Sequence, residues 1–388
     1  MSFKNTDLME TQSSLHKIQI IDLVRTFSIL IVLAVHLQVL LPSPQNGFLR
    51  TLWTTISVTG FYGVSLFFII SGFLITRLID QSLGGLFEPD IRTFYIRRTA
   101  RILPLLALII LFGLFIIYGP FAQNRPMELF FKDKSTSFDG IFWASIFTFS
   151  FNWLRIFRES TTPIFGLHWD VLWSLSIEEQ FYLFYPLLLK RLKNILNLKR
   201  FLVFFIVAGP LFRFIAYVMK PSSFLLLTTN SFAGFEGITM GILLYLTAKK
   251  NSKILSQNKR TCVLLCILGF TVMLTTYIDS QYNRDLIFGQ TFLGLGLFLF
   301  LLGGLHLNWF ESKLFLPLAL PGKVSYGMYL WHASVFYFLL PLAGKMNVFT
   351  AFALIASVTF AAASLSYHFY EMPMNRLIRK SLGSHKSG

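Results

Sequence analysis

Charged residues are scarce in this chain of 388 residues. They supply 13% of it, whereas 54% is hydrophobic and phenylalanine alone occupies 44 positions. Charged residues make up about a quarter of a typical water-soluble protein. A soluble fold could not shield so much apolar surface with so few charges. Together with a mean hydropathy of +0.62, the composition excludes a soluble globular protein and favours an integral membrane protein.

Cysteine and acidic residues are also few. Cys262 and Cys266 lie four residues apart in an apolar run, a helical spacing that matches neither a disulfide framework nor a metal site. The 34 Lys and Arg exceed the 18 Asp and Glu, for a net charge of +16. The basic residues stand in short clusters between apolar runs, which is typical of loops beside membrane helices. We therefore expect a lipid bilayer as the partner, and no nucleic acid.

Apolar runs of about 18–25 residues are long enough to cross a bilayer as helices. The sequence predicts ten of them: about 18–41, 56–79, 101–118, 168–189, 201–219, 229–248, 261–278, 285–304, 324–343 and 349–370. A further stretch, 141–157, is interrupted by Asn152, Arg155 and Arg158. We predict that it is re-entrant or interfacial. The expected fold class is thus an all-α integral membrane protein with about ten transmembrane helices plus this segment.

The positions of the basic residues predict the orientation. If 141–157 does not cross, the clusters at 92–101, 190–200 and 249–260 lie on the same side as both termini. If it crosses, the last two clusters fall outside, against the positive-inside tendency. We therefore predict a multi-pass protein of the cell membrane with cytoplasmic tails at 1–17 and 377–388 and a membrane domain at 18–376. The first run carries Arg25 and His36 and lacks a small-residue cleavage site, so it is expected to stay in the membrane.

Three ionisable residues lie in the first predicted span: Asp22, Arg25 and His36. Arg25 and His36 are eleven residues apart, which places them on one face of a helix to within ~20°. Asp22 is one turn from Arg25 and can pair with it. A histidine in a hydrated pocket is a suitable general base at neutral pH. The alternative is that His36 only bridges two helices by a hydrogen bond.

Arginines gather before the third span, in FYIRRTARILPLL. Helical spacing lets the guanidinium groups of Arg97, Arg98 and Arg101 converge. Guanidinium groups bind phosphate oxygens in bidentate fashion. Ordinary membrane anchoring is the alternative, but lysine would serve that purpose equally well, and Arg77 and Arg92 nearby are arginines too.

Polar groups also crowd one later span, HWDVLWSLSIEEQFYLFYPLLL. A lipid-facing surface cannot carry them, so some must face a polar interior. Glu178 and Glu179 point ~100° apart on a helix, so only one can serve a given small site. Either could orient or charge-balance His36, and a purely structural polar network is the alternative.

Smaller signals complete the pattern. Ser71 and Gly72 in FFIISGFLI are small residues that allow close helix approach. Arg213 and Glu236 are single intramembrane charges that need partners, and each is a candidate for the other. The aromatic residues of SYGMYLWH, with His332, fit an interfacial aromatic belt.

Taken together, these segments resemble the acyltransferase-3 family of membrane proteins, which O-acylate glycans. The resemblance runs from Ile20 to about Arg376. Its motifs appear in the family's order: IIDLVRTFSILIVLAVH, FFIISGFLI, IRRTARILP, WSLSIEEQFYLFYPLLL, SYGMYLWH and FYEMP. Some members carry a fused extracytoplasmic esterase-like domain. Because this chain ends at Gly388, we expect the stand-alone form, in which a separate protein would supply any extracytoplasmic acyl transfer.

The resemblance implies a bacterial inner-membrane enzyme with acyl-CoA, usually acetyl-CoA, as co-substrate rather than bound cofactor. The acceptor would be a hydroxyl of a cell-surface or lipid-linked glycan. In that scheme His36 is the general base or is transiently acylated, and Arg25 positions the donor or stabilises negative charge. Glu178 or Glu179 tunes His36. The donor-binding residues would be Arg97, Arg98, Arg101 and Ser71. No metal is implied, because no His, Cys or carboxylate group has ligand spacing.

A transporter or flippase of a glycan or lipid is the rival interpretation. Intramembrane Arg, His and Glu would then form the substrate path. The absence of paired repeats and of matched Gly- or Pro-broken helices in the sequence favours the enzyme. A non-catalytic assembly protein is the third possibility, and it predicts that His36→Ala is functionally silent.

Overall fold

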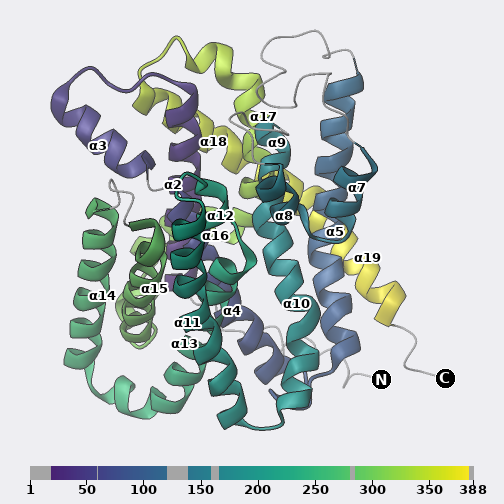
Figure 1. Cartoon of the computed structure of the whole chain (residues 1–388), viewed down its shortest axis with the longest axis vertical. Helices are drawn as coiled ribbons and strands as arrows, with labels where there is room; N and C mark the ends of the chain where they lie inside the picture. Colours follow the sequence, from purple (N-terminus) through teal and green to yellow (C-terminus); the bar gives the residue numbers. More distant parts are fainter. Residues whose placement is uncertain (1–18, 59, 120–138, 159–165, 280–284, 384–388) are drawn as a thin grey trace.

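The computed structural model describes residues 19–58, 60–119, 139–158, 166–279 and 285–383. The described residues form helices and no strand (Figure 1). The ten longest helices among them coincide with the ten predicted spans: α2 (Gln19–Leu40), α4 (Phe61–Ser82), α5 (Ile91–Tyr118), α10 (Leu172–Leu192), α11 (Ile195–Met219), α13 (Ser231–Gln257), α14 (Lys259–Asp279), α15 (Asp285–Gly304), α17 (Ser325–Ala343) and α18 (Val348–Ser366). The all-α membrane fold is therefore confirmed.

Eight helical stretches among the described residues are long and apolar enough to cross a membrane. The helices α10 and α17 are not among the eight. Both are long enough, but they carry the polar residues of WSLSIEEQ and SYGMYLWH. A polar interior was expected for the span of α10, whereas the polar residues of α17 were assigned to an interfacial aromatic belt.

The stretch 141–157 forms two short helices, α7 (Gly140–Phe147) and α8 (Phe151–Phe157), of eight and seven residues. At 1.5 Å per residue each spans only about 12 Å, well short of the ~30 Å hydrocarbon core. Neither can cross a membrane, as the sequence predicts. Other short helices are α3 (Gly47–Val58), α9 (Gly166–Asp170), α12 (Phe224–Thr228) and α16 (Leu316–Lys323), with 3₁₀ turns at Asn308–Glu311 and Lys313–Phe315.

The basic clusters gather at one end of the bundle. The connections between α4 and α5, α10 and α11, and α13 and α14 all lie at the lower end of Figure 1, whereas α3, α7 and α9 lie toward the opposite end. The lower connections carry or adjoin Arg92, Lys193 and Lys259. The charge asymmetry on which the predicted orientation depends is therefore present in the fold.

Close packing of α4 against α13 holds the centre of the bundle. A Cβ atom added at Gly72 would collide with the backbone of Ile238, and one added at Gly241 would collide with the backbone of Ile69. Glycine is required at both positions because the two backbones touch. The prediction of close helix approach at Gly72 is confirmed. α2 lies beside α4 and also contacts α16, α17 and α18, so its polar residues face protein.

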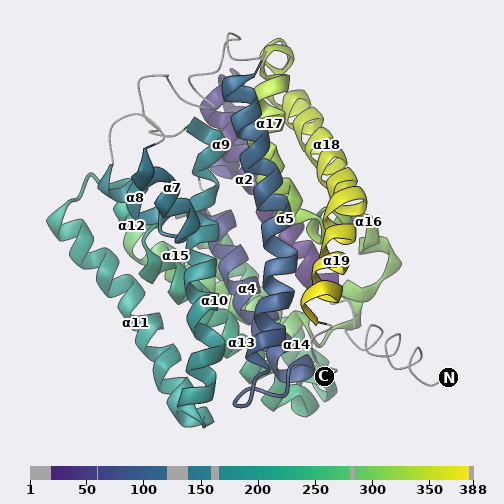
Figure 2. The ribbon, with the colours of Figure 1, turned by 90° about the vertical axis from the view of Figure 1, so that its right-hand side faces the viewer.

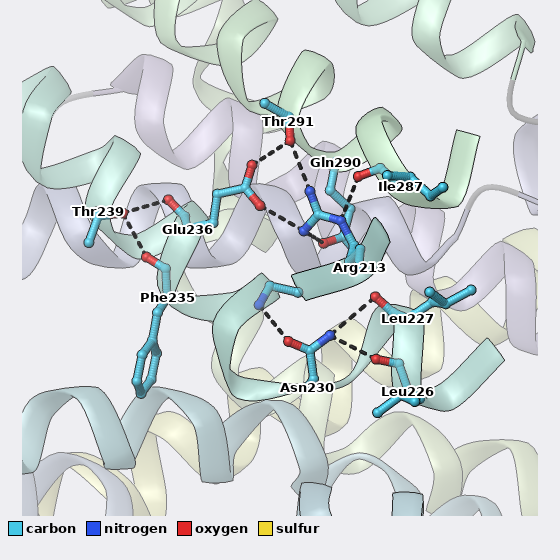
Figure 3. Close-up of polar contacts among 11 residues, drawn as sticks. Arg213, Leu226, Leu227, Asn230, Phe235, Glu236, Thr239, Ile287, Gln290 and Thr291 are labelled. Carbon is cyan, nitrogen blue, oxygen red and sulfur yellow. Dashed lines mark hydrogen bonds and ion pairs between the residues drawn. The ribbon is translucent and has the colours of Figure 1, made fainter. Parts of the chain in front are cut away.

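A buried ion pair joins α11, α13 and α15 (Figure 3). Arg213 Nη1 lies 2.6 Å from Glu236 Oε2, and both side chains are almost fully buried. The remaining nitrogens of Arg213 donate to the carbonyl of Ile287 at 2.7 Å and the hydroxyl of Thr291 at 2.9 Å. The expected Arg213–Glu236 partnership is confirmed, and its saturated hydrogen bonding indicates a structural role.

Cysteine labelling at two exposed positions tests the predicted orientation of the protein in the membrane. In a protein with Cys262 and Cys266 replaced by alanine, we expect Lys345→Cys to react with an impermeant maleimide in intact cells. Lys345 is exposed between α17 and α18, at the end opposite the basic clusters. Lys253→Cys, exposed near the end of α13 at the basic end, should react only after the cells are permeabilised. The reverse labelling pattern would contradict the predicted orientation.

Removing one partner of the buried pair should destabilise the fold. We expect Glu236→Gln to lower the free energy of unfolding by about 3–5 kcal/mol, because Arg213 is left as an uncompensated buried charge. Thermal melting in detergent is the measurement, with Glu88→Gln at an exposed loop position as the control. Replacing both partners, Arg213→Met with Glu236→Leu, should restore much of the loss. Equal melting of Glu236→Gln and wild type would contradict this role.

Candidate functional site

A cavity of about 410 Å³ lies between α2, α4, α5, α10, α17 and α19 (Met372–Gly383). Small-molecule sites commonly have volumes of ~300–1,000 Å³. Apolar side chains such as Phe67 and Leu74 form much of the wall. The polar side chains that line it are six arginines, three serines, three tyrosines and one glutamate: Arg25, Arg77, Arg97, Arg98, Arg101, Arg379, Ser71, Ser174, Ser325, Tyr182, Tyr326, Tyr329 and Glu178.

The first turns of α5 place three of these arginines. The Asp90 side chain caps the helix by accepting from the Thr93 backbone N–H at 3.0 Å, which stabilises the helix start. Arg97, Arg98 and Arg101 follow within two turns and all line the cavity. The three predicted side chains therefore share one cavity. Arg92 does not line the cavity, and it donates instead to the Leu382 carbonyl of α19 at 3.3 Å.

Arg98 is fixed by two neighbours on α10. Its Nη2 lies 3.2 Å from Glu179 Oε1, and its guanidinium carbon lies 3.8 Å above the centre of the Tyr182 ring. Cation–π contacts of this kind add to the ion pair. Glu179 therefore orients a cavity arginine.

The cavity mouth carries an excess of positive charge. Arg97, Arg101 and Arg379 have no ion pair with any carboxylate in the described part of the chain. Arg101 and Arg379 are exposed, so the cavity reaches the protein surface there. Like charges held together favour a polyanionic ligand.

Arg379 was not predicted, because the sequence placed it in the C-terminal tail. The chain continues from α18 through a π-helical turn at Tyr367–Glu371 into α19, which packs beside α5 (Figure 2). Only this packing brings Arg379 to the cavity. A basic amphipathic stretch at the end of the last span was the available signal.

The inner part of the cavity is less charged. Arg25 pairs with Asp22 at 3.4 Å, as predicted. Ser71 and Glu178 line this part of the cavity, and the Ser174 hydroxyl donates to Tyr329 at 2.8 Å. Arg25, Ser71 and Glu178 thus share one cavity with the arginines of α5.

His36 is half-buried and lies beyond the inner wall. It does not line the cavity, and its ring centroid is 4.9 Å from that of His332. His332 in turn lies 5.7 Å from the ring of Tyr329, which does line the cavity. Among the described residues, no hydrogen bond or ion pair joins Glu178 or Glu179 to His36. The tuning of His36 by a glutamate stays a prediction.

His332 is the residue that the sequence analysis missed. The aromatic-belt interpretation is wrong for it, because His332 is 1% exposed. It is also wrong for Tyr326 and Tyr329, which line the cavity. A helix with tyrosines at the membrane interface and a buried polar helix contain the same mixture of residues. The sequence pattern therefore could not distinguish the two. The signal available was a second histidine in an apolar helix, like His36.

A polar layer lies on the far side of His36 from the arginines. Arg155 of α8 pairs with Asp170 of α9 at 2.8 Å and lies within electrostatic range of His36. Gln180 donates to Asn152 at 2.9 Å and to the Phe149 carbonyl at 2.6 Å. These bonds fix the short helices of 141–157 against α10.

Comparison with known proteins assigns the chain to a family. The acyltransferase domain family matches residues 18–368. The peptidoglycan O-acetyltransferase OatA of Listeria monocytogenes is 31% identical over 336 residues, covering 82% of this chain and 51% of that protein. The protein named "Putative peptidoglycan O-acetyltransferase YrhL" of Bacillus subtilis is 28% identical over 368 residues, covering 91% of this chain and 54% of that protein.

The chain spans about half the length of these curated relatives. No solved structure matches it. Because the family match extends over most of the sequence and includes every helix that lines the cavity except α19, the chain belongs to the acyltransferase-3 family of membrane proteins.

Proposed function

We propose that this protein is a membrane O-acyltransferase that moves an acetyl group from acetyl-CoA to a hydroxyl of a cell-surface glycan. One observation carries the proposal: an arginine-lined cavity leads from the basic end of the bundle toward the histidine pair His36 and His332. The names of the relatives favour a peptidoglycan-type acceptor.

The charge distribution suits a coenzyme A thioester. Its phosphates would bind at the mouth, where Arg97, Arg101 and Arg379 form no ion pair with a carboxylate among the described residues. Its uncharged pantetheine arm would lie along the apolar and hydroxyl-bearing wall that includes Ser71. The positive-inside tendency supports a cytoplasmic position for this mouth, on the side of the membrane where acyl-CoA is made available.

We place acetyl transfer at the inner end of the cavity, next to the histidine pair. His36 takes the proton from the acceptor hydroxyl, whose oxygen attacks the thioester carbonyl. The carbon–sulfur bond breaks, and the coenzyme A thiolate leaves with the proton returned by the histidine. Arg25 would position the donor, and Glu178 would align Ser71. A separate extracytoplasmic acyl-transfer protein stays a further prediction, as an alternative to direct delivery of the acetyl group to the glycan.

Loss of a mouth arginine should weaken donor binding. We expect Arg101→Ala to raise the dissociation constant for coenzyme A about 10- to 100-fold, because a hydrogen bond to a charged group contributes roughly 1.5–3 kcal/mol. Calorimetry on protein in nanodiscs measures it. The matched control is Arg200→Ala, which removes an exposed arginine from the basic end but outside the cavity. Equal weakening by both variants would point to a general charge effect instead of a site.

Loss of His36 should stop transfer without preventing donor binding. We expect His36→Ala to lower the turnover number for acetyl transfer about 10²- to 10⁴-fold, the range of general base catalysis. The assay follows release of free coenzyme A thiol with peptidoglycan glycan strands as acceptor. Coenzyme A binding should remain within about twofold of wild type, because the cavity does not include His36. Unchanged turnover would leave His36 with a structural role.

A further inference from the structure

Two histidines from different helices face each other beside the cavity. The rings of His36 on α2 and His332 on α17 have centroids 4.9 Å apart and planes tilted by 36°. At this separation two imidazole rings can bring one nitrogen of each to the ~2.9 Å of a hydrogen bond. Phe336 lies against both rings, at 6.5 Å from His36 and 6.2 Å from His332. The pair is therefore shielded from water on that side.

The hydrogen bonding of His332 defines which nitrogen is free. Its Nδ1 lies 2.6 Å from the carbonyl oxygen of Tyr329. A carbonyl oxygen can only accept a hydrogen bond, so Nδ1 carries the proton. In the neutral ring, Nε2 then holds the lone pair. The hydrogen bond to Tyr329 thus fixes the tautomer of His332, and its accepting nitrogen, Nε2, takes no part in that bond.

The surroundings of the pair suit a neutral proton acceptor. In a common catalytic arrangement a carboxylate orients the base. Here Glu179 pairs with Arg98, and Glu178 lines the arginine cavity, which does not include His36. The charged group within range of His36 is the guanidinium of Arg155. A second imidazole takes the position that a carboxylate holds in other enzymes.

We propose that His332 is the proton-accepting partner of His36, so that the two form a histidine relay. The inference rests on the proposed transferase function. His36 removes the proton from the acceptor hydroxyl with one ring nitrogen and passes the proton on its other nitrogen to Nε2 of His332. The acceptor oxygen bonds to the acetyl carbon, and the carbon–sulfur bond breaks. The proton then returns through the same path to the coenzyme A thiolate, which leaves as the thiol.

The test uses a substitution that keeps the role of one ring nitrogen of His332 and removes the role of the other. In His332→Asn the side-chain amide can still donate to the Tyr329 carbonyl, as Nδ1 does, but nothing accepts a proton in place of Nε2. We expect the turnover number with acetyl-CoA and peptidoglycan glycan strands to fall about 100-fold. The KM for acetyl-CoA and the melting temperature should stay close to those of wild type, because His332 does not line the cavity.

His168→Asn is the matched control. His168 is also buried, contacts Ser334 on α17 at 3.3 Å and lies within electrostatic range of His332, so its replacement disturbs the same helix while both rings of the pair are kept. It should keep most of the wild-type turnover. Turnover in His332→Asn close to wild type, or an equal loss in His168→Asn, would overturn the relay while leaving the transferase function intact. A wild-type protein that neither binds coenzyme A nor transfers acetyl would instead overturn the proposed function.

Discussion

Arginines confined in a low-dielectric environment are the constraint on which this structure depends. Six of them line one cavity, and an uncompensated charge inside a membrane is costly. Two are offset by acids, Arg25 by Asp22 and Arg98 by Glu179. At the mouth, exposed Arg101 and Arg379 retain contact with water. The protein therefore keeps an excess of positive charge where the bundle meets the solvent, and a polyanionic ligand would lower the repulsion.

The same constraint explains the arrangement of the helices. α10 and α17 bring polar residues to the cavity, so they must be surrounded by protein more than by lipid. The close approach of α4 and α13 at Gly72 and Gly241 sets one wall. On the other side α19 packs beside α5 and adds Arg379. Toward the opposite end, Asp170 of α9 pairs with Arg155 of α8, which lies within electrostatic range of His36.

Much of the fold could be predicted from the sequence, because the length of an apolar run and the positions of its charges can be read from the run itself. The ten long helices, the non-spanning segment 141–157 and the Arg213–Glu236 pair required only spacing and the cost of burial. The remainder depended on tertiary packing. Periodicity shows which face of a helix is polar, but it does not show what that face meets. For this reason Arg379 was assigned to a tail and His332 to an aromatic belt. The predicted contact of a glutamate with His36 has no counterpart among the described residues, since Glu179 orients Arg98.

The central claim is that the arginine-lined cavity is the donor site and that its inner end, at Tyr329, lies next to the histidine pair. An experimental structure of the protein with coenzyme A, in nanodiscs, tests this most directly. The account predicts that the phosphates lie within hydrogen-bonding distance of Arg101 and Arg379, with the thiol at the inner end beside Tyr329. Coenzyme A bound elsewhere on the protein, or a cavity filled by lipid in the presence of saturating coenzyme A, would contradict it.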